Sequence, residues 1–403
     1  MWLKMIEDNI NKDDLQEVVK TKIGSKGPIE KKDVRESNLV WDSDKSAQKS
    51  DIAPAYKKQQ TKIEKMVKDM DKISTDLGRG RIKLANDESY ILRYDTTSSV
   101  MFDLALWGWY AIGRHIEIFG IQSSGKTTMS LHAIREKQSK WEICWFVDLE
   151  RTVTRDRMMD LWIDVDMLMT AEPEYAEDAI DEIEIMINSW VSFIVVDSVA
   201  AMLPRQEAQS DAGDTQVMIM GRVMSKAMRK LTPVMHKMWA TVVWLNQTRK
   251  TITMSKDNNV TTWGNALPFY ASQRIKMHRN QALSAQLKDD NWNICWSNIQ
   301  FTVVKNKTSS PFETLTLPIL YDGYIDEGKL IQKYLSDNGF IQTRAKTHYI
   351  EYGDDSLEVG TNLKEIQSML RDREKKQRIT SMMLDQYQVE KKKRSEIARA
   401  RYF

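Results

Sequence analysis

The stretch from residue 116 to 134, "IEIFGIQSSGKTTMSLHAI", limits the fold more than any other part of the chain. An apolar run ends at Gly120, a short polar loop ends in Gly125-Lys126-Thr127, and a helix-like apolar pattern follows. The loop matches G-x-x-x-x-G-K-[ST] at every fixed position, between a predicted strand and a predicted helix. This order of elements predicts an α/β unit that binds the phosphates of a nucleotide.

The residue types of this loop suit that chemistry. Glycines let backbone N–H groups turn inward around phosphate oxygens, and the helix N-terminus adds a favourable dipole for an anion. A lysine at position 126 would reach the terminal phosphates, and the following threonine hydroxyl would hold Mg²⁺. The predicted contacts to the nucleotide are Gly120, Ser123, Ser124, Gly125, Lys126, Thr127 and Thr128.

Between about residues 98 and 320, strand-like apolar runs alternate with longer helical patterns. Such alternation predicts a mostly parallel sheet covered by helices. The run "SFIVVDS" lacks polar alternation, as expected of a strand buried on both faces. The predicted strands are "HIEIFG", "EICWFVDLE", "FIVVDSVA", "TVVWLNQ", "SQRIKMH" and "NIQFTVVKNK".

Two of these strands end in acidic residues. Asp197 closes "FIVVDS" at the edge of the sheet where ligands of open α/β sheets gather, and we expect it to help hold the metal; as an alternative, it caps the next helix. Glu150, in "FVDLE" with Asp148, is placed to orient or deprotonate an attacking water. Its alternative is an ordinary loop charge.

The regions around this core differ from it in composition. Residues 1–54 are charged and without a steady apolar period, which is typical of a mobile arm. Apolar residues at 63, 66, 67 and 70 predict an amphipathic helix over 55–77, followed by a short strand, "RIKL". The predicted parts are an arm at 1–54, a segment at 55–97 whose apolar stripe needs a partner (the oligomerisation segment, a role implied by the resemblance given below), the core at 98–326, a small α+β domain at 327–385 and a basic tail at 386–403.

Net charge and cysteine content narrow the function classes. The formal net charge is +2, so any binding of a polyanion must come from local basic surface. The 2 cysteines lie far apart, which argues against a disulfide framework or a zinc site. The start "MWLKMIEDNINKDD" has acids where a signal peptide needs an apolar core, and no run of about 18 apolar residues occurs. We expect a cytoplasmic chain that does not enter a membrane.

With these residues placed, the chain resembles the bacterial and phage RecA recombinases, which are ATPases that exchange DNA strands. The similarity covers roughly residues 58 to 385. The matching segments stand in the family's order and at close to its spacing. They are "SSGKTT", "VVDSVAA", "MSKAMRKL", "NQTRK", "GNAL-FYAS" interrupted by Pro268, and "VVKNKTSSPF".

The resemblance implies roles in ATP hydrolysis with Mg²⁺ for matching residues. It makes Thr127 and Asp197 the metal residues and Glu150 the catalytic glutamate. Gln247 corresponds to a sensor of the γ-phosphate that links ATP to a DNA-binding loop. Further positions matching family contacts to ATP are Lys305 and Lys307, which reach it across a subunit interface, and Tyr321 and Arg157, which flank the adenine.

The resemblance also implies a helical filament on single-stranded DNA that pairs with homologous duplex DNA and meets mediator proteins. Two polar loops, about 207–217 and 248–264, would face the DNA, and Phe269 would lie at the subunit interface. Such contacts to the backbone should tolerate any sequence and weaken with salt. The matching DNA contacts are Arg222, Ser225, Arg229, Arg249, Ile252, Trp263, Gly264 and Asn265.

The chain departs from the family at several positions. Tryptophan replaces a family glycine at Trp107, Trp109, Trp162 and Trp263, Arg157 stands where the family has an adenine-stacking tyrosine, and a nearby aspartate position reads Thr154. These changes leave two alternatives to an ATP-dependent recombinase. One is a DNA-binding filament scaffold that no longer hydrolyses ATP, and the other is a ring-forming helicase with the same fold.

Overall fold

The computed structural model describes most of the chain in two separate units. The first unit covers Met1–Tyr90 and the second Ile91–Phe403. The described residues are 54–76, 82–106, 110–210, 219–250, 259–261, 264–279, 286–288, 294–309 and 311–402.

In the first unit, the expected amphipathic helix is present as α4 (Pro54–Asp76). Its apolar side chains Ile63, Met66 and Met70 are between 42% and 52% exposed. The expectation of a strand at "RIKL" is wrong for the described residues 82–84, which are irregular. The backbone N–H of Ile82 donates to Asp71 Oδ1 at 2.9 Å, so this segment is bound to a side chain and not to a neighbouring strand. A 3₁₀ turn, η1 (Glu88–Tyr90), follows.

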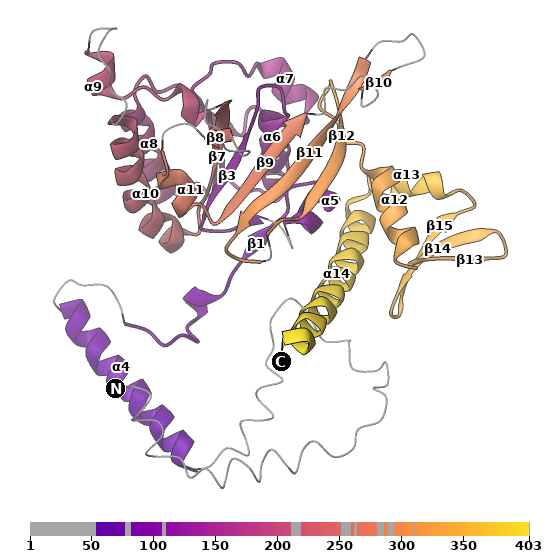
Figure 1. Cartoon of the computed structure of the whole chain (residues 1–403), viewed down its shortest axis with the longest axis horizontal. Coiled ribbons are helices and arrows are strands. Elements are labelled where there is room, and N and C mark those ends of the chain that lie inside the picture. The colour runs from indigo at the N-terminus through magenta and orange to yellow at the C-terminus, as the bar shows by residue number, and fades with distance from the viewer. Residues whose placement is uncertain are drawn as a thin grey trace. The chain divides into compact units, whose positions relative to one another are not determined.

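The second unit is built on one large mixed sheet in the order β10-β11-β9-β3-β7-β6-β4-β5, with β12 beside β11 (Figure 1). The six strands from β9 to β5 run parallel, and β10, β11 and β12 are antiparallel. All six strands expected from the sequence are present, which confirms the predicted fold class. The strands are β3 (His115–Gly120), β4 (Cys144–Asp148), β5 (Leu168–Ala171), β6 (Phe193–Asp197), β7 (Thr241–Lys250), β9 (Gln273–Arg279), β10 (Gln286–Lys288), β11 (Ile294–Asn306) and β12 (Thr314–Leu320).

Helices cover both faces of the parallel part, and each face has its own hydrophobic core. In β6, Phe193 and Val195 belong to one core, whereas Ile194 and Val196 belong to the other. This alternation explains why the first four residues of β6, "FIVV", are all apolar. The helices are α5 (Val100–Ala105), α6 (Lys126–Gln138), α7 (Arg155–Asp160), α8 (Ala176–Asn188), α9 (Arg205–Ala208), α10 (Ile219–Met238) and α11 (Ala266–Tyr270), with the 3₁₀ turn η2 (Val199–Ala201).

Two smaller sheets lie beside the main one. β1 (Tyr94–Asp95) pairs with β2 (Tyr110–Ala111) ahead of the phosphate loop. Near the C-terminus, β13 (Ile341–Arg344), β14 (Thr347–Tyr352) and β15 (Asp355–Gly360) form an antiparallel sheet. The helical elements there are α12 (Gly328–Asp337), η4 (Leu363–Glu365), α13 (Ile366–Met369) and α14 (Arg373–Tyr402).

The C-terminal elements are bonded to the core and end in a long helix. The Glu327 carboxylate accepts hydrogen bonds from the Ser99 hydroxyl at 2.7 Å and from the N–H groups of Val100 and Met101 at 3.1 Å, so it caps α5. The basic residues expected as a separate tail from 386 onward continue α14 without a break to residue 402. The limits proposed for the domains remain a prediction.

Candidate active site

The phosphate loop joins β3 to α6 and has the backbone that its glycines predict. A Cβ at Gly120 would lie 2.1 Å from the carbonyl oxygen of Met277 on β9, so no larger residue fits there. Gly125 caps α6 with φ of 83°, in the left-handed region that glycine tolerates. The sheet therefore fixes where the loop begins, and a glycine fixes where the helix begins.

The side chains of this loop are ready to bind an anion. The Lys126 ammonium donates to the carbonyl oxygens of Ile121 at 2.9 Å and Gly120 at 3.4 Å, and burial lowers its pKa. The Ser124 hydroxyl is buried without a hydrogen-bond partner among the described residues. Such unpaired polar groups are costly unless a ligand satisfies them. A bound phosphate group would supply the acceptor oxygen that the Ser124 hydroxyl lacks.

Thr127 and Asp197 meet at the same edge of the sheet. The Thr127 hydroxyl donates to Asp197 Oδ2 at 2.5 Å. Burial, helped by the carboxylates of Glu150 and Asp148, raises the Asp197 pKa to about 6, although the Thr127 hydrogen bond acts in the opposite direction. A hydroxyl beside a carboxylate in an acidic surrounding is a donor set that suits a hard divalent cation such as Mg²⁺.

Glu150 is held in place by two side chains. Glu150 Oε1 accepts hydrogen bonds from the Gln247 amide at 2.8 Å and from the Ser198 hydroxyl. Gln247 lies level with Gly120 in the parallel pairing of β7 with β3. The sheet thus brings the loop, the acidic residue and the amide together from three separate strands.

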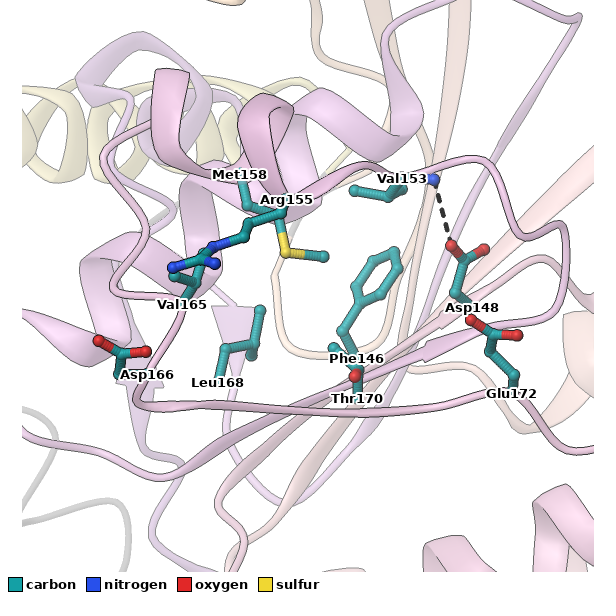
Figure 2. A pocket seen from close by; sticks show the side chains of 10 residues that line it. All are labelled: Phe146, Asp148, Val153, Arg155, Met158, Val165, Asp166, Leu168, Thr170 and Glu172. Atoms are coloured by element: carbon teal, nitrogen blue, oxygen red, sulfur yellow. Dashed lines mark hydrogen bonds between the residues drawn. The ribbon is translucent and has the colours of Figure 1, made fainter.

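Asp148 shapes the turn that carries Glu150. Its carboxylate accepts the N–H groups of Arg151 at 2.7 Å and Val153 at 3.1 Å. Figure 2 shows Asp148 at the rim of an open cavity of about 350 Å³ between α7 and the β4–β5 edge. The cavity contains none of the phosphate-loop residues. Its lining is Phe146, Asp148, Val153, Arg155, Met158, Val165, Asp166, Leu168, Thr170 and Glu172.

Arg157 and Tyr321 are brought together although they are far apart in sequence. The Arg157 guanidinium donates to the carbonyl oxygens of Tyr321 at 3.1 Å and Asp322 at 2.6 Å. The Tyr321 hydroxyl accepts from Arg279 at 2.9 Å, and 49% of the residue is exposed. The Arg279 guanidinium lies 5.8 Å from the centre of the Tyr321 ring, and a half-exposed aromatic ring of this kind can present a flat surface to a base.

Comparison with known proteins identifies the family to which this chain belongs. The profile of the family described as the RecA N-terminal domain matches residues 63–326. The chain is 36% identical to Protein RecA of Mycoplasma mycoides over 313 residues, 76% of this chain and 83% of that protein. It is 38% identical to Protein RecA of Campylobacter hominis over 275 residues, 67% of this chain and 77% of that protein. The chain belongs to the RecA family.

In this RecA-family chain, the phosphate loop lies at the edge of the sheet where the parallel strands end, and the paired lysines lie toward the edge where these strands begin. Lys305 pairs with Arg274 on β9, three residues before Met277, which is level with Gly120. At the strand rise of about 3.3 Å per residue, this separates them by roughly 10 Å along the strands, and further across them. The lysines therefore do not reach their own phosphate loop.

Instead, both lysines lie around Phe269. The Lys305 ammonium donates to the carbonyl oxygens of Pro268 at 2.6 Å and Phe269 at 2.8 Å, and Lys307 donates to Phe269 at 3.0 Å. The Phe269 residue is 73% exposed. Burial lowers the Lys305 pKa to about 8, helped by the nearby charges of Lys307 and Arg274. The Phe269 ring thus lies exposed between two cations, 6.0 Å from the Lys305 ammonium and 5.8 Å from that of Lys307.

The predicted DNA contacts that the structure describes lie on α10 and around α11. Arg222 and Arg229 are exposed, whereas the Ser225 hydroxyl donates to the Gly221 carbonyl oxygen at 2.8 Å. The opposite face of α10 is buried, so these residues point away from the core. Gly264, with φ of 81°, and Asn265 precede α11 and are exposed.

The expectation of a loop over residues 248–264 is partly wrong. Residues 248–250 of β7 pair with β8 (Asn259–Thr261) as an antiparallel ribbon. β7 extends beyond the end of its parallel neighbour β3, and the chain then folds back as β8. β8 supplies the hydrogen-bonding partner for this extension of β7. Arg249 lies in this ribbon, and its side chain is outside the described residues. Ile252, Trp263, Trp107 and Trp109 also fall outside them.

Sequence reasoning missed three residues that serve the site. Ser198 donates to Glu150, and its place directly after Asp197 in "VVDS" was an available signal. The sequence pattern places Asp148 near Glu150 but does not indicate that Asp148 shapes the turn. Arg279 contacts Tyr321 only because β9 and the end of β12 lie close together, and no sequence pattern indicated this.

Proposed function

We propose that this chain hydrolyses ATP while assembled as a helical filament on single-stranded DNA, and that it pairs that strand with homologous duplex DNA. Membership of the RecA family supports recombination and repair as its role. One structural observation carries the proposal furthest. Acidic and phosphate-binding residues gather at one edge of the sheet, and the lysines for the same reaction lie at the other.

In the proposed mechanism, each chain supplies half of an active site. Lys126 and the loop amides bind the phosphates, while Thr127 and Asp197 hold Mg²⁺, which neutralises phosphate charge when bound. Glu150 positions the attacking water and accepts its proton. Lys305 and Lys307 of the next chain stabilise the negative charge that develops during phosphoryl transfer. Tyr321 and Arg157 flank the adenine.

Gln247 supports coupling between ATP and DNA. Its amide donates to Glu150, and from the next residue, Thr248, β7 forms the ribbon with β8 that leads into the proposed DNA segment. A γ-phosphate that changes this hydrogen bond would move the start of the ribbon. ATP binding would then favour the DNA-bound state, and hydrolysis would release it.

On the DNA side, α10 supports contact with phosphates. Arg222 and Arg229 are seven residues apart, which puts both guanidiniums on one face of the helix, with Ser225 between them. Such contacts position the backbone and carry no sequence information. The remaining proposed contacts are Arg249, Ile252, Trp263, Gly264 and Asn265.

Several finer points belong to the same proposal. The oligomerisation segment, the core and the C-terminal domain divide near residues 97 and 326, and mediator proteins assist loading on DNA. The site of action is the cytoplasm of a bacterium or of a phage-infected cell. Within the described parts of the chain, no helix has both the length and the apolar character needed to cross a membrane.

A direct test uses purified protein with ATP, Mg²⁺ and single-stranded DNA. We expect filaments by electron microscopy, DNA-stimulated release of phosphate, and strand exchange with a homologous duplex. Lys126→Ala should lose the phosphate release. Absence of both filaments and stimulated hydrolysis in the unaltered protein would refute the proposal.

A second test addresses the α10 face through salt dependence. Each phosphate contact to single-stranded DNA contributes about 0.7 to the slope of log K against log salt. Replacing both Arg222 and Arg229 by alanine should therefore lower the slope by about 1.4. Lys230→Ala is the matched control, because Lys230 is already paired with Asp181 and Glu184 on α8. Equal slopes in all three proteins would remove α10 from the DNA interface.

The rivals have their own outcomes in these assays. Filaments that hydrolyse ATP no faster than the Lys126→Ala protein would favour the scaffold. Closed hexamers with directional unwinding would favour the helicase.

A further inference from the structure

Four tryptophans stand at helix ends in a backbone conformation that bulky residues avoid. Their φ angles are 62° at Trp141, 61° at Trp162, 69° at Trp190 and 58° at Trp239. In this left-handed region, a Cβ atom lies too close to the following carbonyl oxygen. Ten described residues other than glycine have positive φ, and four of them are tryptophan, although only 13 of the 403 residues are tryptophan.

Each of these tryptophans occupies the same place in the same capping motif. After α8, the N–H of Trp190 donates to the Ile187 carbonyl oxygen at 3.2 Å, and that of Val191 donates to Met186 at 3.1 Å. This pair of bonds ends helices with one left-handed residue, which is usually glycine. The equivalent bonds elsewhere are Trp141 to Gln138 and Glu142 to Lys137, Trp162 to Met159 and Ile163 to Met158, and Ala240 to Met235.

The chain itself shows which residue this motif prefers. After α12, Gly339 has φ of 72° and its N–H donates to Ser336 at 3.1 Å, while Phe340 donates to Leu335 at 2.9 Å. The geometry is the same as at Trp190, but glycine adopts it without strain. The backbone after α6, α7, α8 and α10 is thus the backbone of a glycine-capped helix.

Packing does not compensate for the strain at three of these positions. Trp141, Trp162 and Trp190 are 86%, 81% and 74% exposed. Trp239 does have a contact, since the Arg93 guanidinium lies 4.2 Å from the centre of its ring. Large aromatic residues normally stabilise a fold by burying their rings. An exposed tryptophan in this conformation therefore carries the backbone strain without the stabilisation that burial of its ring would give.

Composition gives an independent observation. The chain contains 16 glycines in 403 residues, about 4%, whereas glycine averages about 7% in proteins. Counting the 13 tryptophans together with the glycines gives about 7%, the usual glycine content. The excess of one residue type matches the deficit of the other.

We infer that positions 141, 162, 190 and 239 are glycine in the protein that the cell makes, because their codon is translated there as glycine and not as tryptophan. A UGA codon permits both readings, since translation systems differ in reading UGA as stop, tryptophan or glycine. Trp145 and Trp244 lie buried within strands, where the backbone makes no demand for glycine, so their codons decide their identity.

The meaning of these glycines for the DNA segment and for ATP hydrolysis rests on the proposed function, whereas the identity of the residues does not. The sequence resemblance already placed tryptophan at family glycine positions, including Trp263 in the proposed DNA segment. If position 263 has the same codon, the cell makes glycine there too, next to Gly264. The main reason for supposing a scaffold that no longer hydrolyses ATP then disappears.

The decisive experiment reads the gene and the natural protein together. We expect UGA codons at positions 141, 162, 190 and 239, and peptides from protein isolated from its own cells should have the mass of glycine at each. UGG codons, or peptides with the mass of tryptophan, would overturn the inference. Exposed tryptophans found in the natural protein would point instead to a docking surface.

A stability measurement tests the physical basis in recombinant protein. Trp190→Gly and Trp190→Ala both remove the exposed ring, but only glycine removes the left-handed strain. We expect the folded-to-unfolded equilibrium constant of the glycine variant to exceed that of the alanine variant by roughly 5-fold to 30-fold. Equal stability of the two variants would contradict the strain on which the inference depends.

Discussion

The two edges of the central sheet are built in contrasting ways. At the edge where the parallel strands end, Lys126 and Asp197 are buried and Glu150 is half-buried. Lys126 donates to carbonyl oxygens of its own loop, Asp197 accepts from Thr127, and Glu150 accepts from Gln247 on β7. Toward the opposite edge, Lys305 and Lys307 donate to the carbonyl oxygens beside the exposed Phe269. One edge is assembled within the chain, whereas the other presents charge and an aromatic surface outward.

Under the proposed mechanism, this difference explains how one chain can bind a nucleotide and yet need a neighbour to hydrolyse it. Binding groups can be fixed permanently, because the sheet holds them in place. Groups that stabilise the transition state can be supplied from outside, so that hydrolysis starts only when chains assemble. Five measurements would break or sharpen the comparison.

The largest effect is expected from the outward edge. Lys305→Ala should lower DNA-stimulated phosphate release by about 10³, the scale of an arginine finger supplied from outside, while nucleotide binding by the free chain persists. Lys329→Ala, which removes an exposed lysine on α12, should change nothing.

Mixing variants distinguishes a neighbour's lysine from the chain's own. In filaments that combine Lys126→Ala and Lys305→Ala chains, some interfaces pair two intact groups. There, the phosphate loop of a Lys305→Ala chain faces Lys305 of a Lys126→Ala chain. We expect such mixtures to regain hydrolysis that neither variant has alone. A mixture as inactive as its components would show that both residues act within one chain.

Glu150→Gln probes the enclosed edge and should lower turnover by about 10² to 10⁴, because the amide cannot accept a proton. Nucleotide affinity should be retained. The matched control is Glu172→Gln, since Glu172 is exposed and forms an ion pair with Arg151 at 3.3 Å. Steady-state phosphate release and nucleotide binding would both be measured; full turnover in Glu150→Gln would remove this residue from the reaction.

A smaller effect is expected for the link between the nucleotide site and the ribbon. Gln247→Ala removes a hydrogen bond to a charged group, worth about 1.5–3 kcal/mol, or roughly tenfold or more in an equilibrium. We expect the ratio of DNA-stimulated to DNA-free hydrolysis to fall by about that factor. Gln342→Ala, on the exposed strand β13, serves as control. An unchanged ratio would mean that coupling follows another route.

The smallest effect should come from pH. Because the Lys305 pKa is lowered to about 8, its charge is lost as pH rises from about 7 to 9, and turnover should decline over this range. Lys305→Arg keeps its charge and should give a flatter profile. The native chain releases this proton more readily than the unfolded chain, so the free energy of unfolding should rise slightly between pH 8 and 10.5. If turnover of Lys305→Arg declines over the same pH range, a group other than Lys305 causes the decline.

Local patterns were enough to predict much of this protein. The phosphate loop, the six strands and the helix α4 were predicted from spacing and apolar period, because these features depend on residues close together in the chain. The strand at "RIKL" failed, because a strand needs a partner for its hydrogen bonds and a local pattern does not show whether one exists. The ribbon of β7 with β8 was missed for the same reason.

The sequence by itself determined that Lys126, Thr127 and an acidic strand end would form a phosphate site. Only the tertiary structure decided that Gln247 and Ser198 hold Glu150, and that Lys305 lies at the far edge. It also decided which tryptophans have a left-handed backbone, because the φ angle of each residue follows from the folded path of the chain around it. Distances between strands arise from pairing over long separations, which no local pattern contains.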